Sequence, residues 1–318
     1  MVNKVKISII IPCYNEERFL PQLFSDIEKL STKNITYEVI VVDNGSTDQS
    51  VEIAKLNNAV VVVDQEANIS KLRNIGAETA CGDLYAFMDA DCLPLSDWLD
   101  ETAKYMNKED VGMFGGIPLC PEDGTWVEKA WLGVSPMGVS EVGFICTANM
   151  IVKKRIFNEV SGFDENLKTG EDYDICQRII KAGYKLIQDD KIAVVHLRYP
   201  KTLMARYKKE IWYGEEMFNI LNVNPLYKPF WTSLLFGFSL LFLLSCIFIS
   251  SFGYMFFCSI ILFIMLPVIS ATYKIKQTNR YEYYFKLIML YYVYLAGRFT
   301  SILKTCLIYA KRTAWKRK

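Results

Sequence analysis

The most restrictive feature of the sequence is a stretch of 45 residues, Pro229 to Tyr273, that contains no charged side chain. One membrane-spanning helix needs about 20 apolar residues, so the stretch has room for two helices and a tight turn. We place the helices near Phe230–Ser250 and Tyr254–Thr272, with the turn ending at Gly253. The alternative is a buried hairpin in a soluble core, which would require the remaining chain to enclose 45 uncharged residues.

Charges are distributed unevenly on the two sides of this stretch. Residues 229–318 carry eleven basic side chains and one acid, whereas residues 1–228 carry 25 basic and 34 acidic ones. An acidic globular part followed by a basic apolar part favours a cytosolic domain on an anionic membrane over a nucleic-acid binder. Lys228 before the hairpin and Lys274 after it place both ends in the cytosol by the positive-inside rule. We therefore predict a multi-pass protein of the cell membrane.

Two further observations agree with a cytosolic location. The apolar run Ile7–Ile11 near the N-terminus is far too short for the core of a signal peptide. The nine cysteines are scattered and include no C-x-x-C pair. They are typical of small buried side chains in a reducing compartment, so we expect neither a disulfide framework nor a zinc site.

The segments beside the hairpin combine basic and aromatic residues. Residues 199–228 indicate a juxtamembrane helix that lies at the membrane interface. In Tyr284–Tyr309, only the eleven residues Leu287–Gly297 are free of charge, which is short of a span. We therefore expect residues 274–318 to form a basic interfacial helix and tail, and a third span stays open as the alternative.

Residues 1–198 alternate between strand and helix patterns. Unbroken apolar runs predict four strands that are buried on both faces, at Lys6–Pro12, Glu38–Val42, Val60–Val63 and Leu84–Met88. Amphipathic stretches between them predict helices at Glu16–Leu30, Thr47–Leu56 and Ile69–Ala80. This order indicates an α/β domain with a Rossmann-like parallel sheet, and such sheets bind ligands where their strands end.

Polar residues follow three of the predicted strands. Asn15 can cap the first helix, and Ser46 and Gln49 have the spacing of a capping box. The fourth strand ends in Asp89-Ala90-Asp91. One aspartate at a strand end is often only a cap or a turn residue. Acidic groups gathered at one sheet edge concentrate negative charge and require a cation.

The glycine-rich phosphate cradles of dehydrogenases and P-loop enzymes are missing, because the sequence contains neither G-x-G-x-x-G nor G-x-x-x-x-G-K-[ST]. A diphosphate would then need a divalent metal held by Asp91, with Arg73 or Lys71 as additional positive charge. Carboxylate and phosphate oxygens suit Mg²⁺ and Mn²⁺. The sequence therefore predicts a cofactor of Mn²⁺ or Mg²⁺.

Five motifs in this order resemble a family 2 glycosyltransferase of GT-A fold. They are S-I-I-I-P-C-Y-N-E-E from Ser8, V-V-D-N-G-S-T-D from Val41, R-N-x-G from Arg73, D-A-D from Asp89 and G-E-D-Y-D-I-C-Q-R from Gly170. The resemblance covers about residues 6–198. The C-terminal helices resemble the membrane anchors of members that work on lipid-linked or membrane-delivered acceptors.

The resemblance implies a role for individual residues. Six of them would contact the nucleotide sugar: Pro12, Tyr14 and Glu16 in the pocket wall, Asp43 at the base, Arg73 near base and diphosphate, and Asp89 at the nucleoside. Asp91 would hold the metal, and Asp172, in the pair Glu171-Asp172, would be the catalytic base. The acidic pair could also simply begin a helix. His196 would either complete the metal site or be a packed side chain.

The function expected from these features is an inverting, metal-dependent transfer of sugar from a nucleotide sugar, in particular a UDP-sugar. The acceptor would be a hydroxyl of a lipid-linked or membrane-delivered glycan at the cytosolic face. The expected partners are the donor, the acceptor and membrane lipids, without nucleic acid. One alternative is a polyprenyl-phosphate glycosyl synthase, whose acceptor phosphate is already ionised. The other is a catalytically silent membrane scaffold that binds a nucleotide.

Overall fold

The computed structural model describes residues 5–30, 35–132, 138–167, 169–215, 217–246 and 253–315. The chain forms two compact units. The first comprises Met1–Glu122 and Pro136–Arg198, and the second comprises Asp123–Ser135 and Tyr199–Lys318. The prediction that residues 1–198 form one domain needs correction for Asp123–Ser135. Val127 and Ala130 of this segment are buried in an apolar cluster with residues from the C-terminal helices.

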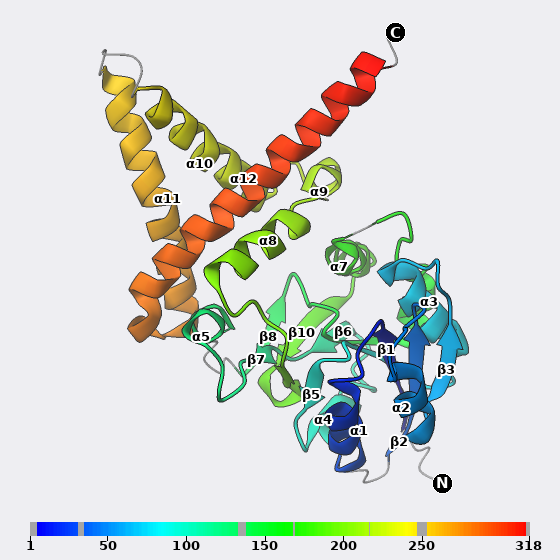
Figure 1. Ribbon diagram of the computed structural model, residues 1–318. Coiled ribbons are helices and arrows are strands. Elements are labelled where there is room, and N and C mark those ends of the chain that lie inside the picture. The colour runs from blue at the N-terminus through cyan, green and yellow to red at the C-terminus, as the bar shows by residue number, and fades with distance from the viewer. Residues whose placement is uncertain are drawn as a thin grey trace. The chain divides into compact units, whose positions relative to one another are not determined.

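The first unit is built around an eight-stranded mixed sheet with the order β3-β2-β1-β4-β9-β6-β10-β8 (Figure 1). The strands are β1 Val5–Cys13, β2 Ile35–Asp43, β3 Val60–Val63, β4 Leu84–Met88, β6 Val111–Gly115, β8 Val139–Val142, β9 Asn149–Lys153 and β10 Lys185–Asp189. The first four in this order are parallel, which confirms the predicted half of the sheet. Strand β9 runs antiparallel to both β4 and β6.

Strand β3 is less buried than predicted. It pairs with β2 at the edge of the sheet, and Val60 and Val63 are exposed. The expectation of burial on both faces is therefore wrong for this strand. Its apolar run is as continuous as those of β1 and β4, so hydrophobicity alone does not distinguish an edge strand from a central one.

The helices after β1, β2 and β3 are α1 Leu20–Glu28, α2 Ser50–Leu56 and α3 Ile69–Thr79. They confirm the three predicted helices, but the first two begin several residues later than expected. Asn15 does not cap α1, because its backbone is left-handed (φ 55°) and its Oδ1 accepts a hydrogen bond from the Thr47 N–H. The capping box is also wrong, since the Ser46 hydroxyl donates to Asp43 and α2 has no side-chain cap. Asn15 thus bonds to the other loop, and Ser46 bonds within its own turn.

A three-stranded sheet completes the first unit, with β5 Cys92–Pro94, β11 Val194–His196 and β7 Pro118–Leu119 in the order β5-β11-β7. Strands β5 and β11 are antiparallel, and His196 pairs with Cys92. This pairing brings the end of β11 to the D-A-D motif. The remaining helices of the unit are α4 Trp98–Ala103, α6 Lys154–Glu159 and α7 Glu171–Lys181.

The second unit is helical, with α5 Trp126–Leu132, α8 Leu203–Tyr213, α9 Met217–Val223, α10 Lys228–Ser245, α11 Tyr254–Thr278 and α12 Tyr284–Trp315 (Figure 1). Among the described residues, two helices are long and apolar enough to cross a membrane, judged by length and composition. They are α10, with a mean hydropathy of 1.3, and α11, with 2.4. Both predicted apolar helices are thus present. The expected end of the first, at Ser250, lies outside the described residues.

Helix α12 is a single helix of 32 residues that packs against α8, α10 and α11. Its Gly297 permits a close approach to α8, because a Cβ at this position would lie 2.7 Å from the Glu210 Cβ. Helix α12 carries Lys286, Arg298 and Lys304 and is not one of the candidate spans. Its placement in the membrane interface stays a prediction.

Candidate active site

The loops that follow β1 and β2 are tied together at the carboxyl edge of the sheet. The Glu16 N–H donates to Ser50 Oγ at 2.7 Å, and the Glu17 N–H donates to an Asp48 carboxylate oxygen at 3.1 Å. The Gln49 N–H donates to Glu17 at 3.0 Å. These bonds hold the two loops in one arrangement. They therefore fix the backbone position from which the Glu16 side chain extends.

Asp43 organises the second of these loops. Its carboxylate accepts the N–H groups of Gly45 and Ser46, each at 2.9 Å, as well as the Ser46 hydroxyl. The side chain is buried. Asp43 thus anchors a turn, and its contact with a nucleotide base stays a prediction.

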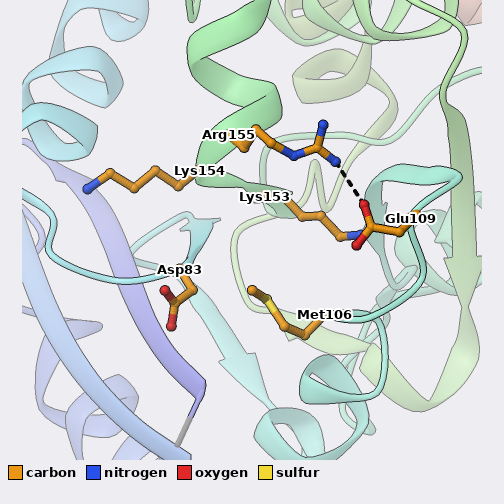
Figure 2. A pocket seen from close by; sticks show the side chains of 6 residues that line it. All are labelled: Asp83, Met106, Glu109, Lys153, Lys154 and Arg155. Atoms are coloured by element: carbon orange, nitrogen blue, oxygen red, sulfur yellow. Dashed lines mark hydrogen bonds and ion pairs between the residues drawn. The ribbon is translucent and has the colours of Figure 1, made fainter. Parts of the chain in front are cut away.

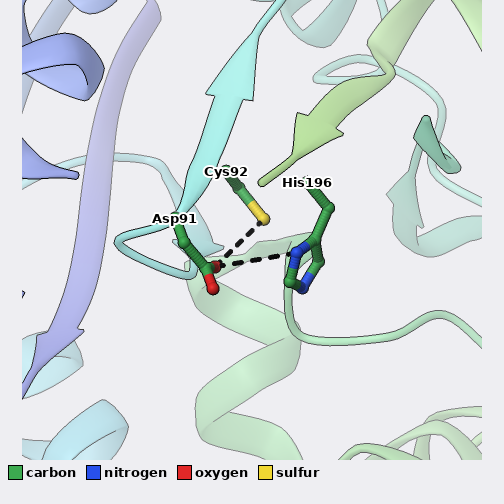
Figure 3. A group of neighbouring side chains, drawn as sticks. All are labelled: Asp91, Cys92 and His196. Carbon is green, nitrogen blue, oxygen red and sulfur yellow. Dashed lines mark hydrogen bonds and ion pairs between the residues drawn. The ribbon is translucent and has the colours of Figure 1, made fainter. Parts of the chain in front are cut away.

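Asp91, Cys92 and His196 form a group whose ligand atoms all lie within 4.8 Å of one another (Figure 3). His196 Nδ1 is 3.9 Å from Asp91 Oδ1. Burial raises the pKa of Asp91 and raises that of Cys92 well above its usual range. The Asp91 carboxylate is the kind of ligand that suits Mn²⁺ and Mg²⁺, whereas thiolate sulfur suits softer metals. The His196 imidazole is a common ligand of transition metals.

Arg73 of α3 joins the D-A-D motif to the start of α7. Its Nη1 is 2.7 Å from Glu171 Oε1, and its Nη2 is 3.2 Å from Asp89 Oδ1. Its side chain is buried, with the guanidinium carbon 5.8 Å from the centroid of the Phe163 ring. Both terminal nitrogens are thus engaged by protein carboxylates, and the contact of Arg73 with base and diphosphate stays a prediction.

Asp172 is the second residue of α7, which begins after Gly170 in a left-handed conformation (φ 80°). One Asp172 oxygen accepts the Tyr173 N–H at 2.8 Å. Burial, followed by the negative charge of Glu171, raises the pKa of Asp172 to about 7, against the opposing influence of Arg73. Glu171 is committed to Arg73, so Asp172 is the carboxyl group of the pair that can accept a proton near neutral pH.

The other residues assigned to the nucleotide differ in exposure and in partners. Pro12 is buried inside β1 opposite Val42, whereas Tyr14 is 57 % exposed. Lys71 forms an ion pair with Asp64, the Nζ and Oδ2 atoms lying 2.9 Å apart. The assignments of Tyr14 and Lys71 to the donor stay predictions. Pro12 can contribute only to the shape of the site.

Two residues in or beside the group of Asp91, Cys92 and His196 have no counterpart in the sequence prediction. Cys92 directly follows the D-A-D motif, but nothing in its spacing distinguishes it from the other cysteines. Arg198 forms ion pairs with Glu16 and with Asp91. Burial raises the pKa of Glu16 to about 7, and Arg198 opposes this increase. A lone arginine two residues after His196 gave no local signal of such a contact.

A separate hollow of about 330 Å³ opens at the opposite edge of the sheet (Figure 2). It is lined by Asp83, Met106, Glu109, Lys153, Lys154 and Arg155. Its charges are largely satisfied by the protein, since Lys153 Nζ donates to the Lys108 carbonyl and Arg155 pairs with Glu109. Asp83 precedes β4 and Asp89 follows it, so this hollow is not part of the candidate site.

Comparison with known families decides the classification. Residues 8–160 match the family described as Glycosyl transferase family 2, and residues 86–300 match Glycosyl transferase family group 2. The chain belongs to glycosyltransferase family 2. This glycosyltransferase has the GT-A fold that the motifs predicted, followed by C-terminal helices.

Several known proteins are similar to this glycosyltransferase. Glycosyltransferase AglE of Haloferax volcanii is 29% identical over 191 residues, which cover 57% of this chain and 63% of AglE. A dolichyl N-acetyl-alpha-D-glucosaminyl phosphate 3-beta-D-2,3-diacetamido-2,3-dideoxy-beta-D-glucuronosyltransferase of Methanococcus voltae is 26% identical, with coverages of 69% and 77%. The residues matched in AglE make up less than two thirds of its length. The mannosyltransferase PcManGT of Pyrobaculum calidifontis, solved with GDP-Man and Mn²⁺, has a TM-score of 0.62 at 16% identity, covering 94% of this chain and 86% of that one.

Proposed function

We propose that this protein is an inverting glycosyltransferase that moves a sugar from a nucleotide sugar, a UDP-sugar in the first instance, to a hydroxyl of a lipid-linked or membrane-delivered glycan. The observation that carries the proposal is Asp172. It is a carboxyl group with a pKa of about 7, and Arg73 connects the residue before it to Asp89 of the D-A-D motif. A base of this strength fits the removal of a proton from an attacking hydroxyl.

The proposed reaction is a single displacement. The acceptor oxygen forms a bond to the anomeric carbon while the bond from that carbon to the diphosphate breaks, and its electron pair stays on the diphosphate. Asp172 takes the proton of the acceptor hydroxyl. Because the acceptor attacks opposite the leaving group and no enzyme nucleophile takes part, the anomeric configuration inverts.

Asp91 and His196 would hold the divalent cation, because their donor atoms converge. A carboxylate suits Mn²⁺ and Mg²⁺, and imidazole is a common ligand of transition metals. A bound Mn²⁺ or Mg²⁺ would offset negative charge on the departing diphosphate. The similar mannosyltransferase was solved with Mn²⁺, which supports assigning a divalent metal to this chain. The Cys92 sulfur would be a poor ligand for such a cation.

Membrane association is supported by the surfaces of α10 and α11. Only 28% and 11% of the apolar windows of these helices are buried inside the protein. A core helix of a soluble protein would be covered, and water-exposed apolar surface of this extent is costly. We assign both helices to the membrane, with the catalytic unit in the cytosol. The Methanococcus voltae relative is named for a dolichyl-linked sugar phosphate, which supports a lipid-linked acceptor.

The donor and metal assignments can be tested together by binding. In a thermal-shift panel of nucleotide sugars with Mn²⁺ and Mg²⁺, a selective ligand should raise the melting temperature. Chelation with EDTA should abolish transfer. Asp91→Ala should weaken Mn²⁺-dependent UDP binding by about a hundredfold, since a bound cation contributes several kcal/mol, and should barely change uridine binding. The exposed Asp97→Ala serves as a matched control. Equal weakening of UDP and uridine would mean that Asp91 only shapes the pocket.

The membrane topology can be tested by labelling intact cells with an impermeant thiol reagent. Cys81, in the catalytic unit, and Cys306, in α12, are exposed cysteines and should remain unlabelled if both lie in the cytosol. Gly253→Cys should be labelled from outside, because Gly253 directly precedes α11 and a Cβ at this position meets no atom within 4 Å. Labelling of Cys306 in the native protein would instead indicate a third span through α12.

A further inference from the structure

Arg198 bridges the two acidic groups of the candidate cation site. Its Nη2 forms an ion pair with a Glu16 oxygen, and its Nε lies 3.5 Å from Asp91 Oδ2. The Arg198 side chain is 51% exposed, whereas those of Glu16 and Asp91 are 14% and 11% exposed. Arg198 therefore covers the two carboxylates from the solvent side.

The guanidinium has a second support. Its carbon atom lies 4.8 Å from the centroid of the Phe19 ring. Stacking on an aromatic face tolerates lateral movement of the guanidinium, because the attraction to the ring is broad and does not require one hydrogen-bond geometry. Half exposure and a stacked position allow Arg198 to exchange partners without unfolding its surroundings.

Arg198 and a divalent cation would share one carboxylate. Asp91 is the acidic ligand of the proposed metal site, and a cation on its oxygens would repel the guanidinium 3.5 Å away. Glu16 would keep Arg198 beside the site. A donor diphosphate arriving with the cation would bring negative oxygens that an arginine binds well.

We infer that Arg198 is an exchangeable counter-ion of the donor site, which neutralises Asp91 and Glu16 before the donor binds and then transfers to the diphosphate. In that second position it would stabilise the oxygen that keeps the electron pair when the sugar bond breaks. This inference rests on the proposed function, because it requires a diphosphate donor with a cation at Asp91. It predicts effects of opposite sign for metal binding and for nucleotide binding.

The test compares Arg198→Gln with Arg18→Gln in the full-length protein. Arg18 is an exposed arginine that contacts the same Phe19 ring, at 5.4 Å from its centroid, so it controls for lost charge and lost stacking. Mn²⁺ binding is measured without nucleotide by electron paramagnetic resonance of the free ion. UDP binding, with GDP in parallel, is measured by calorimetry at saturating Mn²⁺.

Arg198→Gln should bind Mn²⁺ alone about two- to fivefold more tightly, because the competing exposed ion pair is gone. It should bind UDP with Mn²⁺ about ten- to a hundredfold more weakly, because a charge-assisted hydrogen bond is lost. Arg18→Gln should change neither. Arg198→Lys keeps the charge, so its affinity for Mn²⁺ alone should stay near that of the native protein, while its UDP affinity should fall between those of the native and glutamine forms.

The outcomes separate this inference from the proposed function. If the native protein binds Mn²⁺ and UDP or GDP but Arg198→Gln matches Arg18→Gln in either measurement, the counter-ion exchange is overturned and the proposed function is untouched. If the native protein binds neither nucleotide in the presence of Mn²⁺, the proposed function fails with it. Native-like thermal unfolding of each variant excludes misfolding as the cause.

Discussion

Asp172→Asn should lower kcat by about 10² to 10⁴, the range expected when a general base is removed, while Mn²⁺-dependent nucleotide binding stays near its native level. The amide has nearly the shape of the carboxyl group, and it can still accept the hydrogen bond from the Tyr173 N–H. Only the ability to take a proton is lost. Initial rates of transfer and calorimetric binding of the nucleotide, measured on the same preparations, check both parts.

Asp174→Asn is the matched control for this variant. Asp174 lies in the same first turn of α7 and pairs with Arg178 four residues later, at 2.6 Å. Loss of this partly exposed ion pair should change the rate of transfer by less than about twofold, since surface ion pairs contribute little to stability. Substantial turnover by Asp172→Asn would favour the polyprenyl-phosphate alternative, because an acceptor phosphate is already ionised and needs no base.

The pKa of Asp172 predicts how the rate of transfer falls at acidic pH. A base with a pKa of about 7 is mostly protonated at lower pH, so kcat/KM should fall about tenfold for each pH unit below 7. Above pH 7, kcat/KM should become independent of pH. The pKa of Glu16 is also about 7, and Glu16→Gln distinguishes the two groups. An unchanged acid limb in that variant assigns the limb to Asp172.

Glu210→Ala should destabilise the second unit by about 3–5 kcal/mol, the cost of breaking a buried ion pair from one side. Glu210 is fully buried between two arginines. It forms ion pairs with Arg206 of its own helix and with Arg298 of α12, whose Nε is 2.8 Å from Glu210 Oε2. The alanine would leave two guanidinium groups without their carboxylate, in a place that water does not reach.

This effect is measured by unfolding the purified protein in detergent. The loss of the α8–α12 contact is monitored by cysteine cross-linking. Glu215→Ala is the control, because Glu215 pairs with Lys304 of the same α12 at 2.8 Å, but on a more exposed surface. That variant should change the free energy of unfolding by less than about 1 kcal/mol. Equal behaviour of the two variants would contradict the structural importance of the buried network.

The Glu210 network also explains why α12 was difficult to interpret from sequence. Arg298 interrupts an apolar stretch and therefore argued against a membrane span. In the structure, Arg298 is held by Glu210 and by the Tyr213 carbonyl, both supplied by α8. A charged residue whose partner is on another helix looks solvent-facing in any pattern that considers one helix at a time.

The sequence by itself determined the features that depend on neighbouring residues. Continuous apolar runs located β1, β2 and β4, amphipathic spacing located α3, and the absence of charge located α10 and α11. The D-A-D motif was found because it directly follows a predicted strand, and the Glu171-Asp172 pair was found through the resemblance to family 2 glycosyltransferases. The continuity and the spacing of apolar residues are local properties, so they predict where a strand or helix lies. The exposed edge strand β3 shows that they do not predict how deeply that element is buried.

Only the tertiary structure decided which polar groups are partners. Arg73 and Glu171 are 98 positions apart, and Glu16 and Arg198 are 182 positions apart. Each pair forms because the sheet order places the loops after different strands at one edge. The same folding drew Asn15 away from its expected cap and Asp43 into a turn. Hydrogen bonds and ion pairs depend on distances of about 3 Å, and the fold sets those distances between residues that sequence spacing does not relate.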